Sequence, residues 1–372
     1  MSGNTEPKSR PAQAFNADEY ARRIRRLVTV LRSKKLDGAV IKNGISRLYY
    51  TGFESSAGTL LIDAEKGPVF IVDFRYIFMA KKAMPFVKCV MQESGAPSEL
   101  AKHTAKWKSC GYETRDSYAS VEGLKNFLSK VEKWEAIDAD ISLQRSVKSA
   151  AEQKLMRKVI AANDAMYAWV LPQLHPGMSE WEMRNVFRRG ADLFGQGESF
   201  DTIACVGANG AECHHEPGET VLGAKGPVLM DFGLMLDHYC ADMTRCVSFG
   251  KPSKFYTEIF KIVYDANRKA VGKIKPGMTG EEVDAIARKH IAAAGYGDAF
   301  GHSLGHGLGM EVHEAPNFSP RSKTVIKPGM IITVEPGIYL PGKVGVRIED
   351  VVLITKNGCE CLTSSPRDLV IL

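Results

Sequence analysis

The chain has 372 residues, of which 44% are hydrophobic and 25% charged, and its 34 Gly and 17 Pro are ordinary usage. This length predicts about two domains of roughly 150 residues, and the composition excludes a stapled miniprotein, a coiled coil and a wholly disordered chain. The 49 Lys+Arg exceed the 43 Asp+Glu only slightly and form no long basic block, so we expect no nucleic-acid partner.

The N-terminal stretch, MSGNTEPKSRPAQAFN, has no apolar targeting segment, and no stretch approaches the ~18 apolar residues of a membrane span. The 8 cysteines include no CxxC pair, which favours reduced thiols. We therefore expect a cytoplasmic protein without a membrane partner, with a loose tail at residues 1–15.

The first predicted domain, residues 16–145, mixes helical and strand patterns. Apolar spacing predicts helices over residues 18–36 and 74–82. Short β-type runs lie at 38–41, 59–62 and 69–72. This order indicates a small α/β domain.

A second domain is predicted over residues 146–372, because a helical pattern over 150–174 ends at His175-Pro176-Gly177. Its sequence then repeats at an offset of 100 residues: Pro176-Gly177-Met178-Ser179 recurs as Pro276-Gly277-Met278-Thr279. Each copy continues with a capping box, a helix and a strand. Two copies predict two similar half-domains about a pseudo-two-fold axis, with a cleft between them.

Two pairs of acids are placed on predicted hairpins. Asp231 and Asp242 are equidistant from a turn near Leu236-Asp237, so we expect them to face each other directly, and Glu335 and Glu349 are symmetric about Gly342. Their apolar neighbours predict buried strands, where an unpaired carboxylate costs several kcal/mol. Each pair therefore needs a cation, which metal ions would supply.

Histidines lie between the acid pairs in GHSLGHGLGMEVHEAP, at positions 302, 306 and 313. The glycines disfavour a helix, so we expect an extended segment that approaches a ligand closely. His214 follows Met178 about as far as His313 follows Met278. The pseudo-two-fold axis would bring these two histidines to one cleft.

At this point the sequence resembles the pita-bread metallopeptidases, which include methionine aminopeptidase, aminopeptidase P and prolidase. The resemblance is carried by Asp-Phe-Gly at 231–233, Asp-Met-Thr-Arg at 242–245, Gly-His-Gly-Leu-Gly at 305–309, His-Glu at 313–314, Val-Glu-Pro-Gly-Ile-Tyr at 334–339 and Gly-Val-Arg-Ile-Glu-Asp at 345–350. Tyr49-Tyr50-Thr51-Gly52-Phe53 and Asp73-Phe74-Arg75-Tyr76 are similar to the amino-terminal domain of prolidases and Xaa-Pro aminopeptidases. The implied fold is α+β: a pita-bread catalytic domain preceded by a smaller creatinase/prolidase-like α/β domain.

The resemblance implies that two metal ions are bound, with Asp242 and Glu349 bridging. The implied ligands are Asp231, Asp242, His306, Glu335 and Glu349. It also places His214 and His313 beside the substrate. One departure is Cys213, where relatives commonly have proline before the histidine.

We expect Glu335 to act as general base and His214 or His313 to stabilise the tetrahedral intermediate. His302 and Arg347 are predicted to help bind substrate, Arg347 by holding a carboxylate that is either the substrate's or the protein's own. The mostly hard ligand set suits Mn²⁺ first, and also Co²⁺, Fe²⁺ or Zn²⁺. Two bridged ions would share a water and lower its pKa, so the predicted nucleophile is a bridging hydroxide.

The predicted function is hydrolysis of the bond between an N-terminal residue and proline in small peptides, by a homodimer. Dipeptides and longer peptides both remain open as substrates, as does the preferred first residue. An alternative is a metal-dependent hydrolase or lyase of a small non-peptide substrate on the same fold, and another is an inactive binding module.

Overall fold

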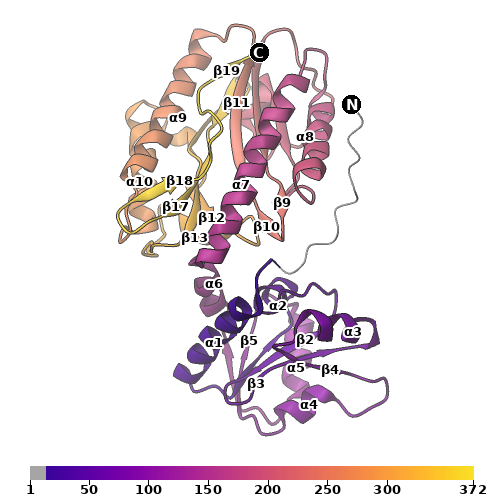
Figure 1. Cartoon of the computed structure of the whole chain (residues 1–372). Coiled ribbons are helices and arrows are strands. Elements are labelled where there is room, and N and C mark those ends of the chain that lie inside the picture. The colour runs from indigo at the N-terminus through magenta and orange to yellow at the C-terminus, as the bar shows by residue number, and fades with distance from the viewer. Residues whose placement is uncertain (1–13) are drawn as a thin grey trace. The chain divides into compact units, whose positions relative to one another are not determined.

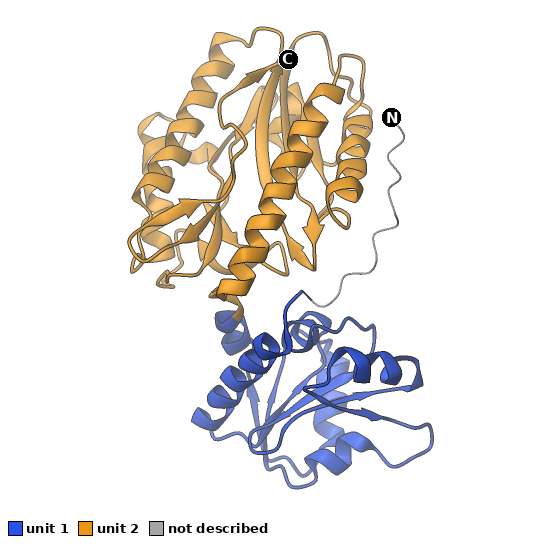
Figure 2. Cartoon of the chain, viewed as in Figure 1, with its two compact units in different colours: residues 1–144 blue, residues 145–372 orange. Residues whose placement is uncertain are grey.

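The computed structural model describes residues 14–372 (Figure 1). This part of the chain forms two compact units, which divide between Gln144 and Arg145 (Figure 2). The expected tail over residues 1–15 lies outside the described residues up to position 13, and the ring of Phe15 packs against Tyr20. Within residues 14–372, no helix is both long and apolar enough to cross a membrane.

Unit 1 contains one six-stranded sheet with the order β4-β3-β2-β1-β5-β6. Its strands are β1 (Gly38–Ile41), β2 (Thr59–Asp63), β3 (Gly67–Val72), β4 (Lys88–Met91), β5 (Ser109–Tyr112) and β6 (Lys133–Ala136). Its helices are α1 (Ala17–Ser33), α2 (Gly44–Thr51), α3 (Phe74–Ala83), α4 (Glu99–Thr104) and α5 (Tyr118–Phe127), and α6 (Asp138–Ser146) begins in it. The predicted α/β character is confirmed, with β1 antiparallel to β2 and parallel to β5.

The first helix ends earlier than its apolar spacing predicts. Lys35 takes a φ of 56°, and the amide of Leu36 donates to the carbonyl of Leu31, 2.9 Å away. This six-residue closure is the Schellman pattern that terminates helices. Leu36 continues the apolar spacing because it is buried beneath the helix end, not because it is helical.

Unit 2 contains a four-stranded sheet of order β19-β11-β8-β7, a five-stranded sheet of order β13-β12-β14-β17-β18 and two hairpin ribbons, β9-β10 and β15-β16. Its strands are β7 (Ile203–Val206), β8 (Gly226–Phe232), β9 (Met235–Leu236), β10 (Tyr239–Cys240), β11 (Met243–Phe249), β12 (Gly305–Gly307), β13 (Glu314–Phe318), β14 (Ile331–Val334), β15 (Gly337–Leu340), β16 (Val344–Arg347), β17 (Asp350–Ile354), β18 (Cys359–Cys361) and β19 (Val370–Ile371). Its helices are α7 (Ala150–Val170), η1 (Leu171–Gln173), α8 (Glu180–Phe194), η2 (Gly207–Ala211), α9 (Lys254–Lys273), α10 (Gly280–Ala293) and η3 (Gly297–Ala299).

The internal repeat corresponds to two helix pairs, since α7 packs on α8 and α9 packs on α10 (Figure 1). Both predicted capping boxes form: Ser179 with Glu182 begins α8, and Thr279 with Glu282 begins α10. Each box satisfies backbone amides at the helix start, so each copy begins its second helix in the same way. An apolar core of α9, α10, β14 and β17 residues lies behind the five-stranded sheet.

The two hairpins differ in how closely they follow the predicted register. Val334 pairs with Asp350 and Gly337 pairs with Arg347, so Glu335 and Glu349 are opposed as predicted, in the gap between the two ladders. In the other hairpin the prediction of direct opposition is wrong, because Asp231 pairs with Thr244.

The cause of the shift is the turn after β9. It is formed by Asp237 and His238, with φ values of 49° and 65°, and these left-handed values are those of a two-residue type I′ turn. The turn is centred one residue later than predicted, which moves Asp242 to a diagonal position relative to Asp231. Side chains alternate along strands, so the even shift leaves both acids on the same face.

Candidate metal centre

A cavity of about 520 Å³ in unit 2 brings the predicted site residues together. It is lined by Asp231, Asp242, His306, Glu335 and Glu349, and also by His214, His302, His313 and Arg347. All nine side chains singled out from the sequence therefore line one cavity.

The five predicted ligands lie on strands or directly next to them. Asp231 is the second-to-last residue of β8, and Asp242 directly precedes β11. His306 is the central residue of β12, which confirms the extended segment expected there. Glu335 directly follows β14, and Glu349 directly precedes β17. Of the four acids, Asp242 and Glu349 are buried, whereas Asp231 and Glu335 are partly exposed.

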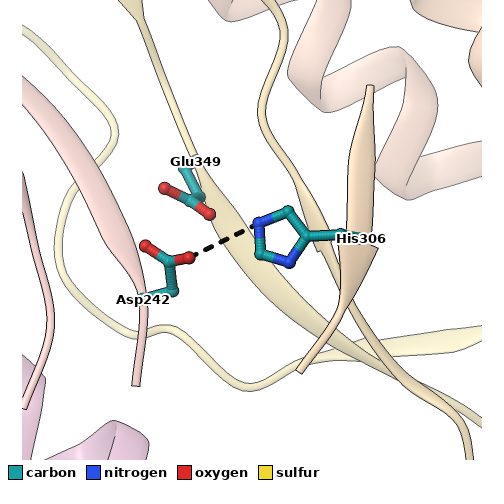
Figure 3. Close-up of side chains that lie close together, drawn as sticks. All are labelled: Asp242, His306 and Glu349. Carbon is teal, nitrogen blue, oxygen red and sulfur yellow. Dashed lines mark ion pairs between the residues drawn. The ribbon is translucent and has the colours of Figure 1, made fainter. Parts of the chain in front are cut away.

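Three of these residues lie close enough to share one cation. Ligand atoms of Asp242, His306 and Glu349 all lie within 4.8 Å of one another (Figure 3). The His306 Nε2 atom is 3.5 Å from Asp242 Oδ2 and 3.2 Å from Glu335 Oε1. The arrangement therefore centres on the imidazole, with carboxylates of both hairpins around it.

Among the described residues that line the cavity, two have a buried carboxylate oxygen without a hydrogen-bond partner: Asp231 at Oδ1 and Glu349 at Oε1. Glu349 is only 1% exposed, so bulk solvent hydrates its carboxylate poorly. A buried, unpaired carboxylate oxygen is costly unless it coordinates a cation. The residues present fit divalent metal ions, for which carboxylate and imidazole are suitable ligands.

The raised pKa values of Asp242, Glu349 and His306 also indicate a site for a cation. Burial, together with the charges of Glu349 and Asp231, raises the pKa of Asp242 well above its usual value. Burial and the charges of Glu335 and Asp231 likewise raise the pKa of Glu349. Burial would lower the pKa of His306, but its hydrogen bond to Glu335 raises that pKa to about 9. Burial would raise the pKa of Glu335, but its hydrogen bond to His306 lowers that pKa. Asp242, Glu349 and His306 retain protons more readily because negative charges lie close together, and a divalent cation would neutralise that charge.

Comparison with known proteins follows the same division of the chain. Residues 154–356 match metallopeptidase family M24, and residues 23–147 match the creatinase/prolidase N-terminal domain. An Xaa-Pro dipeptidase of Pyrococcus furiosus is 34% identical over 351 residues, which cover 94% of this chain and 99% of that protein.

Solved structures agree with the sequence matches. The Xaa-Pro dipeptidase from Bacillus anthracis has a TM-score of 0.89 at 36% identity, covering 95% of this chain and 100% of that one. The X-Pro aminopeptidase from Thermotoga maritima has a TM-score of 0.84 at 33% identity, covering 92% and 100%. The chain belongs to metallopeptidase family M24. Its fold is therefore a pita-bread domain preceded by a creatinase-like domain, and its cofactors are divalent metal ions.

In this metallopeptidase, Arg347 connects the two hairpins from beneath the acids. Its Nη2 donates to Asp231 Oδ2, and its Nε donates to Thr244 Oγ1, 2.9 Å away. Thr244 in turn donates to Glu349 Oε2 at 2.9 Å. Of the two carboxylates considered for Arg347, the one it holds in the structure is the protein's own Asp231. The pairing occupies one oxygen of each acid and leaves the other oxygen free for a metal ion.

Two neutral groups complete this network and escaped the sequence reasoning. The Tyr339 hydroxyl accepts from Arg347 Nη1 at 2.8 Å and lies 2.8 Å from His302 Nε2. Tyr339 is the last residue of the Val-Glu-Pro-Gly-Ile-Tyr motif at 334–339, and its place there is the signal that could have revealed it. Asn267 on α9 donates through Nδ2 to the carbonyls of Val334, 3.0 Å away, and Ile348, 3.3 Å away. Nothing in the helical pattern marks Asn267.

His302 and His313, which are predicted to face substrate, both have lowered pKa values. Burial, together with the charges of His306 and His214, lowers the pKa of His313. Burial is also the main cause of the lowered pKa of His302. The rings of His306 and His313 are 4.3 Å apart between centroids. A neutral imidazole at His313 retains one N–H that can donate a hydrogen bond near neutral pH.

The residue after His313 is fixed by buried charges. Glu314 pairs with Arg145 and with Lys148, whose Nζ is 3.1 Å from Glu314 Oε2. Burial would raise the pKa of Glu314, but the charges of Lys148 and Arg145 outweigh it and lower that pKa to about 2. The backbone that carries His313 is thereby held from outside the cavity.

Replacing Asn267 by leucine should weaken metal binding about 10- to 100-fold, because the two carbonyls next to the glutamates lose their shared donor and the hairpin spacing relaxes. A chelator-competition titration measures the affinity. The matched control is Asn163→Leu, which removes a buried amide that contacts Leu234 but no residue adjoining a predicted ligand. Equal affinity in the wild type and Asn267→Leu would show that Asn267 does not set the ligand geometry.

Replacing Glu314 by glutamine should lower the free energy of unfolding at pH 7 by about 3 kcal/mol, since a carboxyl with a depressed native pKa stabilises the fold at neutral pH. That contribution is present above the unfolded pKa near 4.5 and is lost as the pH falls toward about 2. Urea denaturation from pH 7 to pH 3 measures the difference.

The control for that measurement is Glu311→Gln, because Glu311 also pairs with Arg145 but leaves Glu314 bound to both cations. We expect it to cost much less stability. A difference between the wild type and Glu314→Gln that stayed constant across the pH range would contradict a role for the carboxylate charge.

Proposed function

We propose that this metallopeptidase hydrolyses the bond between an N-terminal residue and a following proline in small peptides. The observation that carries the proposal is the cavity itself, which combines buried, under-coordinated carboxylates with histidines and an apolar wall. A metal-dependent hydrolase acting on a non-peptide substrate has no comparable support, and the fitting cluster of buried acids disfavours an inactive binding module.

The proposed metal ligands are Asp231, Asp242, His306, Glu335 and Glu349, holding two divalent ions with Mn²⁺ as the first expectation. Asp242 and Glu349 come from different hairpins and have ligand atoms within 4.8 Å of one another and of His306, so both acids would be available to the bound ions together. When bound, divalent ions polarise a peptide carbonyl and make hydroxide available near neutral pH. Arg347 and Thr244 orient the carboxylates for this task from behind.

The proposed catalytic residues act on protons and charge at the scissile bond. Glu335 lines the cavity beside His306 and takes up the proton of the attacking water as general base. His313 donates its N–H to the oxygen on which negative charge develops, and His214 lies close enough to influence the pKa of His313 and acts beside it. His302 is held by Tyr339 at the same wall and contacts substrate.

Selectivity for proline follows from the chemistry of its peptide bond. An Xaa-Pro bond is a tertiary amide without an N–H, so a site that binds it must recognise the ring and not that donor. Phe200, Ile203 and Val312 line the same cavity and supply apolar surface for a pyrrolidine ring. The similar proteins named above include both a dipeptidase and an aminopeptidase, so substrate length must be measured.

Other expectations from the sequence stay predictions. These are the cytoplasmic location, the homodimer and the identity of the metal as Mn²⁺. Substrate partners other than small peptides are not proposed.

An Xaa-Pro dipeptide or Xaa-Pro-Yaa tripeptide should be cleaved with kcat/KM at least ~10-fold above its Xaa-Ala counterpart, about 1.4 kcal/mol of preferential transition-state binding. Steady-state kinetics of metal-loaded enzyme on the four matched peptides measures this ratio. The ratio of dipeptide to tripeptide separates the two activities. Equal turnover of the proline and alanine peptides would remove the proline assignment.

Replacing His313 by alanine should lower kcat by about 10²–10³ while the bound metal stays unchanged, because the lost N–H stabilised only the developing oxyanion. Elemental analysis and kinetics on the same preparation separate the two effects. His175→Ala is the control, since His175 is exposed outside the cavity. Metal loss in His313→Ala would instead identify His313 as a ligand.

A further inference from the structure

The segment that carries His214 has its own buried anchor. Residues 207–218 run from η2 to Gly218, whose amide contacts Glu180 at the start of α8, and His214 lies between the two ends. The His214 ring forms no hydrogen bond within residues 14–372. Its orientation in the cavity therefore depends on how firmly the surrounding backbone is held.

Glu180, the first residue of α8, is completely buried and binds this segment through both carboxylate oxygens. Its Oε1 accepts from the Val206 amide at 2.7 Å and from Asn209 Nδ2 at 2.9 Å. Its Oε2 accepts from the Gly218 amide at 3.2 Å and lies 2.8 Å from His215 Nε2. One carboxylate thus reaches both ends of the segment and the residue next to His214.

His215 links this carboxylate to a second one. Its Nδ1 lies 2.8 Å from Glu212 Oε2, so both ring nitrogens face carboxylates. Burial alone would lower the pKa of His215, but the hydrogen bonds to Glu212 and Glu180 raise it. An imidazolium donates from both nitrogens, which suits a link between two acids.

The other side of the segment is held by close backbone packing. A Cβ atom on Gly345 would lie 1.6 Å from the carbonyl oxygen of Gly210, so only glycine permits this approach. Gly345 is two residues before Arg347 on β16. Glu180 on one side and β16 on the other therefore enclose the backbone on which Cys213 and His214 sit.

In the second half-domain, the residue that follows the cavity histidine His313 is also held by buried charges, but their signs are reversed. The residue after His313 is Glu314, which is held by Arg145 and Lys148, whereas the residue after His214 is His215, held by Glu180. The helix position matching Glu180 is Gly280, where a Cβ atom would meet the Asn317 carbonyl at 2.2 Å. In each half-domain, the residue after His214 or His313 points away from the cavity and fixes the backbone of that histidine.

We propose that Glu180 is a positioning residue that, through His215 and the 207–218 backbone, holds His214 where it acts on substrate. The catalytic part of this inference rests on the proposed function, because it assigns a role to His214 in turnover. Glu180 touches neither the metal ligands nor the substrate cavity. Its loss should lower kcat without releasing metal.

The test compares Glu180→Ala, Glu180→Gln, His214→Ala and the double variant Glu180→Ala/His214→Ala. Glu182→Ala is the matched control, because Glu182 caps the same helix through Ser179 but does not contact the segment. We expect Glu180→Ala to lower kcat about 10- to 100-fold, as displaced catalytic groups do. Glutamine keeps an acceptor oxygen and should restore most of the rate, and Glu182→Ala should keep it.

The double variant should be no slower than His214→Ala, because Glu180 acts through that histidine. Multiplying effects would overturn the proposal. Should Glu180→Ala fail to fold, His215→Ala removes one link to the same carboxylate and takes its place in the comparison.

Hydrogen exchange followed by mass spectrometry gives a readout that needs no turnover. Peptides over 206–218 should lose protection in Glu180→Ala, while those over 300–316 and the bound metal stay unchanged. Unchanged protection over 206–218 would overturn the proposal even if the enzyme were inactive on every proline peptide. Absence of Xaa-Pro cleavage by the wild type would contradict only the proposed function, and the rate comparison would then use whichever peptide is cleaved.

Discussion

The site in unit 2 is dominated by the mutual repulsion of four acids that line one cavity. Asp242 and Glu349 resist ionisation there, and His306 holds a proton more tightly than usual, because the surrounding charge is negative. Arg347 is the buried arginine that balances part of this charge, through Asp231. The packing of the two half-domains keeps the four acids together in spite of their repulsion. Divalent ions bound there would neutralise the negative charge, so the same repulsion favours metal binding.

The surroundings of the site divide the work between charged and neutral groups. Arg347 and Thr244 each occupy one oxygen of an acid and leave Asp231 Oδ1 and Glu349 Oε1 without protein partners. Asn267 connects the carbonyls of Val334 and Ile348, the residues that precede the two glutamates. Farther out, Glu180 and Glu314 hold the backbone beside His214 and His313, respectively. Each layer restricts the geometry of the layer inside it, which a site requiring accurately placed groups needs.

Much of the site could be predicted because the distance of two residues from the centre of a hairpin turn determines whether they face each other. The opposition of Glu335 and Glu349 followed from a turn centred on Gly342. Asp231 and Asp242 are not directly opposed, because their turn is centred one residue later than predicted. Composition could not reveal that Asp237 and His238 adopt left-handed values. Asn267 and Glu180 were not predicted, because their hydrogen-bond partners lie far away in the sequence and depend on tertiary packing. The end of α1 was predicted three residues too late, because buried Leu36 continues the helical spacing of apolar residues beyond Ser33.

The most direct measurement of the central claim is a calorimetric titration of metal-stripped protein with Mn²⁺, together with elemental analysis of the loaded protein. We expect two ions per chain and a rise in the unfolding temperature on loading, since ligands that bind only the folded state stabilise it. Asp242→Asn and Glu349→Gln should each weaken both binding events, because these acids are the proposed bridges. A chain that binds no divalent ion, or whose stoichiometry and affinity survive both substitutions, would contradict a metal centre built on these acids.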